Sequence, residues 1–121
     1  MILGFQKRFV HKILADTKIH TIREDKHDRW RDGRPIQMAT GVRTKKYRCF
    51  NDRDSCKGTQ KISITHTKRG FLRARIAGKN VSHEGLMLLA RNDGFESLID
   101  FCLWFNKDFV GKIIHWTDFR Y

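Results

Sequence analysis

The chain is 121 residues long, with 40% hydrophobic and 12% aromatic residues, which predicts one folded domain over residues 1–121 and excludes a disordered polypeptide. Its formal net charge of +12 favours a polyanionic partner, because self-repulsion of this size costs stability unless an anion relieves it. The sequence shows no signal peptide or membrane span, and its three cysteines have neither disulfide nor zinc spacing, so we expect a cytoplasmic protein without metal, cofactor or membrane contact.

The positive charge is concentrated in the middle of the chain. Residues 41–81 hold twelve Lys or Arg and two Asp, a net charge of +10. Residues 1–40 have a net charge of +4, and residues 82–121 have a net charge of −2. Charge distributed this unevenly indicates a surface that binds an anion, because charge that serves only solubility would be spread over the whole chain.

The first forty residues contain apolar runs separated by charged segments. The apolar run at 2–5 predicts a strand, and the spacing of apolar residues within 7–15 predicts one face of a helix. The segments 18–23 and 35–40 predict two further strands, because the first is rich in β-branched residues and the second is a short run closed by glycine. The charged segment 24–34 between them predicts a solvated loop.

The central segment predicts a long basic loop followed by a hairpin. Residues 43–58 have no clear period and are dense in charge, which is typical of a loop. Apolar and polar residues alternate at 61–67 and at 71–76, which predicts two strands joined by a turn at 68–70. A further turn is expected at 77–80.

The last third predicts two helices and a strand. Ser82 is a suitable N-cap for a helix that ends near Gly94. Ser97 begins an amphipathic helix that reaches Phe105, and residues 112–121 predict a closing strand. These elements amount to a mixed α+β domain with five or six mostly antiparallel strands and three helices, and strands this short would suit a small β-barrel.

Two motifs near the ends of the chain occur in an order known from one family. An apolar helix and a short turn within 9–23 lead to Lys-x-x-Thr-x-Arg at 18–23, and Asp-Gly-Phe-x-x-Leu follows at 93–98. Both resemble elements of ASCH domains, which carry the first motif on an early strand and an acidic-Gly-Phe-x-x-Leu element before the last helix. The resemblance covers both ends of the chain, whereas residues 41–81 do not align.

The resemblance implies a PUA-like fold, a small mixed or antiparallel β-barrel with about three flanking helices. It also implies an association with RNA, and one bacterial branch of the family looks like small amidohydrolases that deacetylate N4-acetylcytidine. The catalytic Lys, Thr and Glu of that branch fall by position on Lys18, Thr21 and Asp93. Here Asp replaces Glu, so the carboxylate is one methylene shorter.

An amide hydrolase without a metal needs a nucleophile and a base to activate it. Thr21 is the candidate nucleophile, and Lys18 is the candidate base if burial or a cation such as Arg23 keeps the lysine neutral. On a regular strand Lys18 and Thr21 point to opposite faces, so they converge only if Lys18 precedes the strand or a bulge intervenes. The alternative is structural: a solvated lysine, a threonine within the sheet, and an Asp93 that begins a turn.

Three further residues are candidates for contacts with a ligand. Arg23 suits a phosphate or a base edge, or alternatively an ion pair with Glu24 or Asp25. His20 lies inside the first motif and suits a hydrogen bond to a base, or alternatively a structural role. Trp30 lies in a charged loop and is expected at the mouth of a cleft. The large rings expected in the core are Trp104, Phe105 and Trp116.

The basic stretch 43–57 is the candidate for contact with a nucleic-acid backbone. Its rings offer stacking platforms for bases while its cations suit phosphates. The alternative is a solvated loop whose rings fold into the core. The candidate residues are Arg43, Lys45, Lys46, Tyr47, Arg48, Arg53 and Lys57.

These patterns leave three classes of function open. The favoured one is an RNA- or nucleoside-binding protein with a basic ligand cleft, for which we expect binding that weakens with salt. The second is a small, metal-independent amidohydrolase for nucleosides of the N4-acetylcytidine type. The third is a structural or interaction module with neither ligand.

Overall fold

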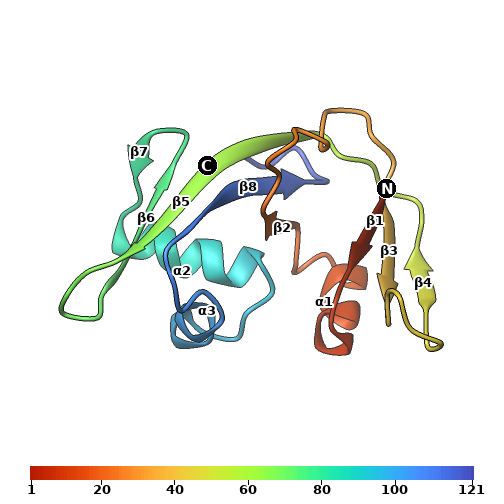
Figure 1. The fold of residues 1–121 in the computed structure, drawn as a ribbon, viewed down its shortest axis with the longest axis horizontal. Coiled ribbons are helices and arrows are strands. Elements are labelled where there is room, and N and C mark those ends of the chain that lie inside the picture. Colours follow the sequence, from red (N-terminus) through yellow and green to blue (C-terminus); the bar gives the residue numbers. More distant parts are fainter.

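The structure is a computed structural model that describes all residues, 1–121, as a mixed α+β fold (Figure 1). The helical elements are a 3₁₀ turn η1 (Lys7–Phe9), α1 (Val10–Leu14), α2 (His83–Asn92) and α3 (Leu98–Trp104). The strands are β1 (Ile2–Gly4), β2 (His20–Arg23), β3 (Gln37–Thr40), β4 (Arg48–Asn51), β5 (Gly58–His66), β6 (Leu72–Ile76), β7 (Lys79–Asn80) and β8 (Phe109–His115). The expected α+β class is therefore confirmed.

The strands form two sheets. The larger sheet has the order β2-β8-β5-β6-β7 with antiparallel neighbours throughout, and the smaller has the order β1-β3-β4. In the smaller sheet β1 runs parallel to β3, while β4 runs antiparallel to it across an irregular register. This pairing leaves two separate sheets and closes neither into a barrel.

The two faces of β5 and β6 differ because successive side chains point to opposite sides of a sheet. Ile62, Ile64, Ala74 and Ile76 are buried, while the residues between them face outward. Helices α2 and α3 lie on one side of β5 and β8, and no helix lies on the other (Figure 1). Buried residues of both sheets and of the helices form one core cluster of 22 hydrophobic side chains.

Both predicted N-caps are confirmed. The Ser82 hydroxyl accepts a hydrogen bond from the Gly85 backbone N–H at 3.1 Å, and the Ser97 hydroxyl accepts one from the Asp100 N–H at 3.2 Å. Each bond satisfies a backbone donor that a helix leaves unpaired in its first turn. The cap at Ser82 fixes the start of α2, whose opposite end carries Asp93 into the candidate site.

Two strands were not expected from the sequence, and the bounds of the last strand are wrong. The segment 43–58 contains strand β4, because its backbone pairs with β3 although its side chains show no alternation. The expected turn at 77–80 contains β7, a two-residue strand on the edge of the larger sheet. The last strand spans 109–115 rather than 112–121, and the residues after it fold back so that the Tyr121 N–H donates to Gln60 Oε1 at 3.0 Å.

Candidate functional site

A cleft of about 420 Å³ opens at the edge strand β2, between the start of the chain and the segment that links α2 to α3. Its lining comes from segments far apart in the sequence, among them β1, η1, β2 and the end of α2. It includes four of the residues proposed from the sequence, Lys18, Thr21, Arg23 and Asp93. The other residues that line it are Gly4, Phe5, Gln6, Phe9, Ile22, Val42, Phe95, Trp104 and Phe105.

Lys18 lies two residues before β2, which is why strand alternation does not separate it from Thr21. Its side chain is 3% exposed, and its Nζ donates to the Asp93 backbone carbonyl at 2.5 Å and to Asp93 Oδ1 at 3.0 Å. Burial lowers the pKa of the Lys18 ammonium below its usual value, although Asp93 acts in the opposite direction, and the nearby charges of Arg23 and Lys12 lower this pKa further. The site therefore favours a lysine that gives up its proton more easily than a solvated one.

Asp93 is the residue that ends helix α2, where its backbone N–H still bonds to the Leu89 carbonyl at 3.0 Å. Gly94 follows with φ of +91°, and a Cβ there would meet Lys18 Cδ at 2.9 Å. The turn thus needs glycine both for its backbone conformation and for the close approach of the lysine. It brings a carboxylate one methylene shorter than glutamate within hydrogen-bond distance of Lys18.

One oxygen of Asp93 is saturated and the other is free. Oδ1 contacts both Lys18 Nζ at 3.0 Å and His20 Nδ1 at 3.2 Å. Oδ2 has no hydrogen-bond partner in the protein. Among fully buried polar side-chain atoms only His115 Nδ1 lacks a partner, so Oδ2 must be at least partly accessible. Oδ2 is therefore available to accept a hydrogen bond from a ligand.

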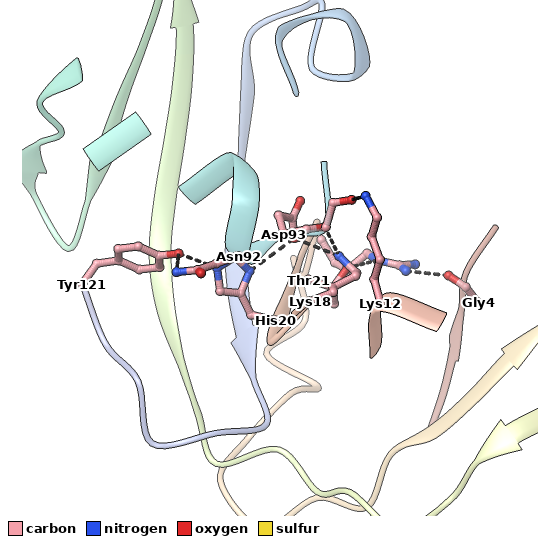
Figure 2. Close-up of polar contacts among 10 residues, drawn as sticks. Gly4, Lys12, Lys18, His20, Thr21, Asn92, Asp93 and Tyr121 are labelled. Atoms are coloured by element: carbon pink, nitrogen blue, oxygen red, sulfur yellow. Dashed lines mark hydrogen bonds and ion pairs between the residues drawn. The ribbon is translucent and has the colours of Figure 1, made fainter. Parts of the chain in front are cut away.

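His20 connects Asp93 to the end of the chain (Figure 2). Asn92 Nδ2 donates to the Tyr121 hydroxyl at 3.1 Å, so that hydroxyl is free to donate its own proton to His20 Nε2 at 2.6 Å. With Nε2 accepting, Nδ1 carries the proton and donates it to Asp93 Oδ1. Burial lowers the pKa of His20 in spite of Asp93, which agrees with a neutral ring.

Thr21 and Arg23 lie on the same face of β2, two residues apart. Arg23 Nε donates to Thr21 Oγ1 at 3.1 Å, and its Nη2 donates to the Gly4 carbonyl of β1 at 2.5 Å. The guanidinium is not paired with Glu24 or Asp25, the alternative weighed from the sequence; Asp25 pairs instead with Lys112. Burial lowers the pKa of Arg23, and Asp93 opposes this shift.

Aromatic rings form the apolar wall of the cleft. Lys18 Nζ lies 4.9 Å from the centre of the Phe9 ring, and Arg23 Cζ lies 5.1 Å from the centre of the Phe5 ring. Phe95 packs against Phe9 edge to face with ring centres 5.5 Å apart. Cations over ring faces beside an accessible carboxylate make a site that suits a flat, polar ligand.

Two expectations about tryptophans are wrong. Trp30 is 6% exposed and belongs to the core, because the Asp25 carboxylate accepts the backbone N–H groups of Arg29 and Trp30 and folds the loop inward. Trp104, expected in the core, is 46% exposed at the end of α3 and lines the cleft. Phe105 and Trp116 are buried as expected.

The basic stretch 43–57 lies outside the cleft, although it begins next to Val42, which lines it. All seven of its candidate side chains are exposed, and only Lys57 has an acidic partner, Asp118 at 3.7 Å. Phe50, one of its rings, packs against the core. His20 also lies outside the cleft lining and reaches it through Asp93.

Sequence reasoning missed the residues that support the site from a distance. Tyr121 contacts His20 across 101 positions, and Lys12 donates to the Gly94 carbonyl at 2.7 Å across 82 positions. Tyr121 has no neighbouring motif, and Lys12 lies in the helix before the first motif among other outward-facing cations, so no local pattern indicates either contact. Phe5, Phe9 and Phe95 are buried and also line the cleft, which their spacing in the sequence does not indicate.

No group of three or more His, Cys, Asp or Glu side chains is arranged to hold a metal ion, and no helix has the length and hydrophobicity of a membrane span. Comparison of the chain with family models, curated proteins and solved structures gives no match.

Proposed function

We propose that this chain binds a nucleoside, or a single unstacked base of an RNA, in the cleft beside β2. The observation that carries the proposal is the convergence of Lys18, Arg23 and Asp93 with the rings of Phe5 and Phe9 around about 420 Å³ of space. That volume lies within the range of small-molecule sites, and its lining combines apolar walls with a few polar groups.

A pyrimidine with an amino group, such as cytosine, matches the chemistry of the lining. Its flat ring would stack against the aromatic wall, as unpaired bases do in RNA-binding proteins. Its exocyclic amine would donate to Asp93 Oδ2, the carboxylate oxygen without a protein partner. The cations of Lys18 and Arg23 would donate to the carbonyl oxygen or to a neighbouring phosphate.

The motifs at 18–23 and 93–98 support assignment to the ASCH family as part of the same proposal. A PUA-like arrangement of the two sheets around one core, without a closed barrel, belongs to it as well, as does a cytoplasmic location. The basic stretch 43–57 would hold the backbone of an RNA whose base enters the cleft, since it starts next to Val42 and its cations are exposed.

Fluorescence of Trp104 offers a direct test, because this ring lines the cleft while Trp30 and Trp116 are buried. Cytidine should quench the emission with a saturable dependence, and Trp104→Phe should lose the signal. Val42→Phe, which narrows the cleft, should weaken binding at least about tenfold, whereas Val110→Phe on the exposed face of β8 should not. Equal binding by both valine variants would refute the proposed site.

Amide hydrolysis is a second candidate, favoured by the contact between Arg23 and Thr21. Because Arg23 Nε donates to Thr21 Oγ1, the threonine keeps its own proton free to pass to a base. Lys18 lines the same cleft beside Thr21, and burial lowers its pKa toward the range of a working base (Figure 2).

The reaction on an N4-acetylated cytidine would proceed in two steps, acyl transfer to Thr21 and hydrolysis of the acyl-threonine. Thr21 Oγ attacks the acyl carbon as Lys18 takes the hydroxyl proton, and the C–N bond breaks as that proton passes to the N4 leaving group. Water then attacks the acyl-threonine and returns its proton through Lys18, which releases acetate and restores the hydroxyl. Arg23 would stabilise the charge on oxygen during both steps.

Release of acetate from N4-acetylcytidine tests this candidate separately from binding. Activity should be present in the wild type, be lost in Thr21→Val and fall by at least about a hundredfold in Lys18→Met. No release by the wild type under conditions in which cytidine binds would leave a binding protein and exclude the hydrolase.

A further inference from the structure

The outward face of β5 and β6 carries an uncompensated array of cations. Residues 58–80, which contain β5, β6 and β7, hold six Lys or Arg and no Asp or Glu. All six side chains are exposed. They are Lys61, Lys68, Arg69, Arg73, Arg75 and Lys79.

Strand register places the central members of this set side by side. Arg73 pairs with Thr65, and Arg75 pairs with Ser63, so both arginines point to the same face as Lys61 on β5. Side chains two positions apart on a strand stand about 7 Å from one another. We use the name basic sheet face for Lys61, Arg73 and Arg75.

The charges of the basic sheet face have no acidic partner, and no ion pair involves any of the three residues. The contrast is Lys112, which lies opposite Lys61 in the sheet and is paired with Asp25 and Asp28. The charge of Lys112 is thus compensated by two carboxylates of the same chain, whereas the charge of Lys61 is not. Lysines that only protect a sheet edge would not explain this face, since β5 is flanked on both sides by β6 and β8.

We infer that the basic sheet face binds the phosphate backbone of single-stranded RNA. This inference rests on the proposed RNA-binding function but assigns it a second surface, outside both the cleft and the stretch 43–57. Contacts from a flat row of cations reach phosphates without selecting bases. At the end of the hairpin Phe71 is exposed next to Lys68 and Arg69, which offers a ring for stacking one base.

The composition of the face favours RNA over an anionic membrane or a protein. Apart from Phe71 at the hairpin tip, its exposed large apolar side chain is Val110, 76% exposed on β8. Stable protein interfaces need a cluster of apolar or aromatic anchors at their centre, and three cations alone attach only weakly to an anionic membrane unless apolar side chains insert as well. Serine and threonine hydroxyls at positions 63 and 65 instead complement phosphate oxygens.

The test compares two triple variants of the full chain that each remove three positive charges. Lys61→Gln, Arg73→Gln and Arg75→Gln alter the basic sheet face. The matched control is Arg29→Gln, Arg31→Gln and Arg34→Gln, three exposed arginines of the loop after β2. Binding of a labelled single-stranded RNA is measured over a range of salt concentrations, binding of cytidine is measured by Trp104 fluorescence, and thermal unfolding shows that both variants are folded.

The sheet-face variant should bind RNA at least about tenfold more weakly than the control, with a salt slope shallower by about 2, because each lost phosphate contact removes about 0.7. Its cytidine binding should be unchanged. Equal loss in both triple variants would show dependence on net charge alone and would overturn the inference. The inference would also be overturned if the wild type bound cytidine but no RNA, or if the basic sheet face bound phosphatidylserine vesicles and not RNA. A wild type that binds RNA but no cytidine would instead refute the proposed cleft.

Discussion

Replacing Asp93 by alanine should destabilise the fold strongly, because it removes the buried carboxylate that pairs with Lys18 and accepts from His20 and leaves Lys18 Nζ only the backbone carbonyl of residue 93. The side chains of Lys18 and Asp93 are 3% and 5% exposed, and Oδ1 receives both Lys18 Nζ and His20 Nδ1. Breaking a buried ion pair from one side costs about 3–5 kcal/mol. Lys18 can escape by losing its proton, which relative to the unfolded chain with its usual pKa of 10.5 costs about 5 kcal/mol at pH 7. Because burial already lowers this pKa in the wild type, that figure is an upper limit for the loss caused by the substitution.

A double-mutant cycle separates this effect from a simple loss of packing. Lys18→Met, Asp93→Ala and the double variant are unfolded in urea at pH 7, with circular dichroism as the signal. The double variant should retain at least about 1.5 kcal/mol more stability than the sum of the two single losses predicts, because it leaves no isolated charge. Additive losses, or a loss below about 1 kcal/mol for Asp93→Ala, would refute the reasoning.

The same cycle has a dependence on pH whose sign follows from Lys18. The pKa of this lysine is lower in the folded protein than in the unfolded chain, so the unfolded chain binds more protons between that lowered pKa and about pH 10.5. Stability therefore rises with pH in that window. The deficit of Asp93→Ala should accordingly shrink between pH 7 and pH 9.5, and a deficit that grows would contradict the assigned protonation.

The remaining predictions concern neighbouring groups. Burial lowers the pKa of His115 to about 3, so as the pH falls below 6.5 the unfolded chain gains a proton and the folded protein does not. Between pH 7 and pH 5 this difference should lower the free energy of unfolding by about 1 kcal/mol after allowance for solvent screening. His115→Gln should therefore make the stability depend less on pH over this range. Gly94→Ala should cost about 1–3 kcal/mol by urea unfolding, because φ is +91° and the new Cβ would meet Lys18; an unchanged midpoint would show that the turn relaxes freely. His20→Phe should cost about 1–3 kcal/mol and weaken cytidine binding, since it releases Asp93 Oδ1, and unaltered affinity would limit His20 to a structural role.

The close spacing of the first motif explains why part of the site could be predicted. Thr21 and Arg23 are two residues apart on one strand, which fixes them on a common face. Asp93 follows a helix whose start and end are both marked in the sequence. The position of Lys18 outside the strand, by contrast, depends on Lys12 and Asn92, whose carbonyls accept the backbone N–H groups of residues 18 and 19.

The exposure of large side chains could not be predicted from local sequence. Trp30 lies in a charged loop, but three contacts to the Asp25 carboxylate fold that loop onto the core. Trp104 ends a helix of seven residues and is left at the rim of the cleft. Strand β4 depends on pairing with β3 rather than on its own pattern, since tertiary pairing overrides weak β-propensity.

The long-range support of the site lies beyond any local signal. Tyr121 fixes the tautomer of His20 from a segment that the sequence indicated as strand. The hydrogen-bond chain from Asn92 to Asp93 becomes visible only in three dimensions (Figure 2).

Titration of the ¹⁵N-labelled protein with cytidine, followed by amide chemical shifts, tests most directly whether the cleft beside β2 is a ligand site. Saturable shifts should centre on Lys18, Thr21, Asp93 and Phe95, and Val42→Phe should need at least about tenfold more cytidine to reach the same shifts. Shifts confined to β5 and β6, or no shifts at millimolar cytidine, would contradict the central claim.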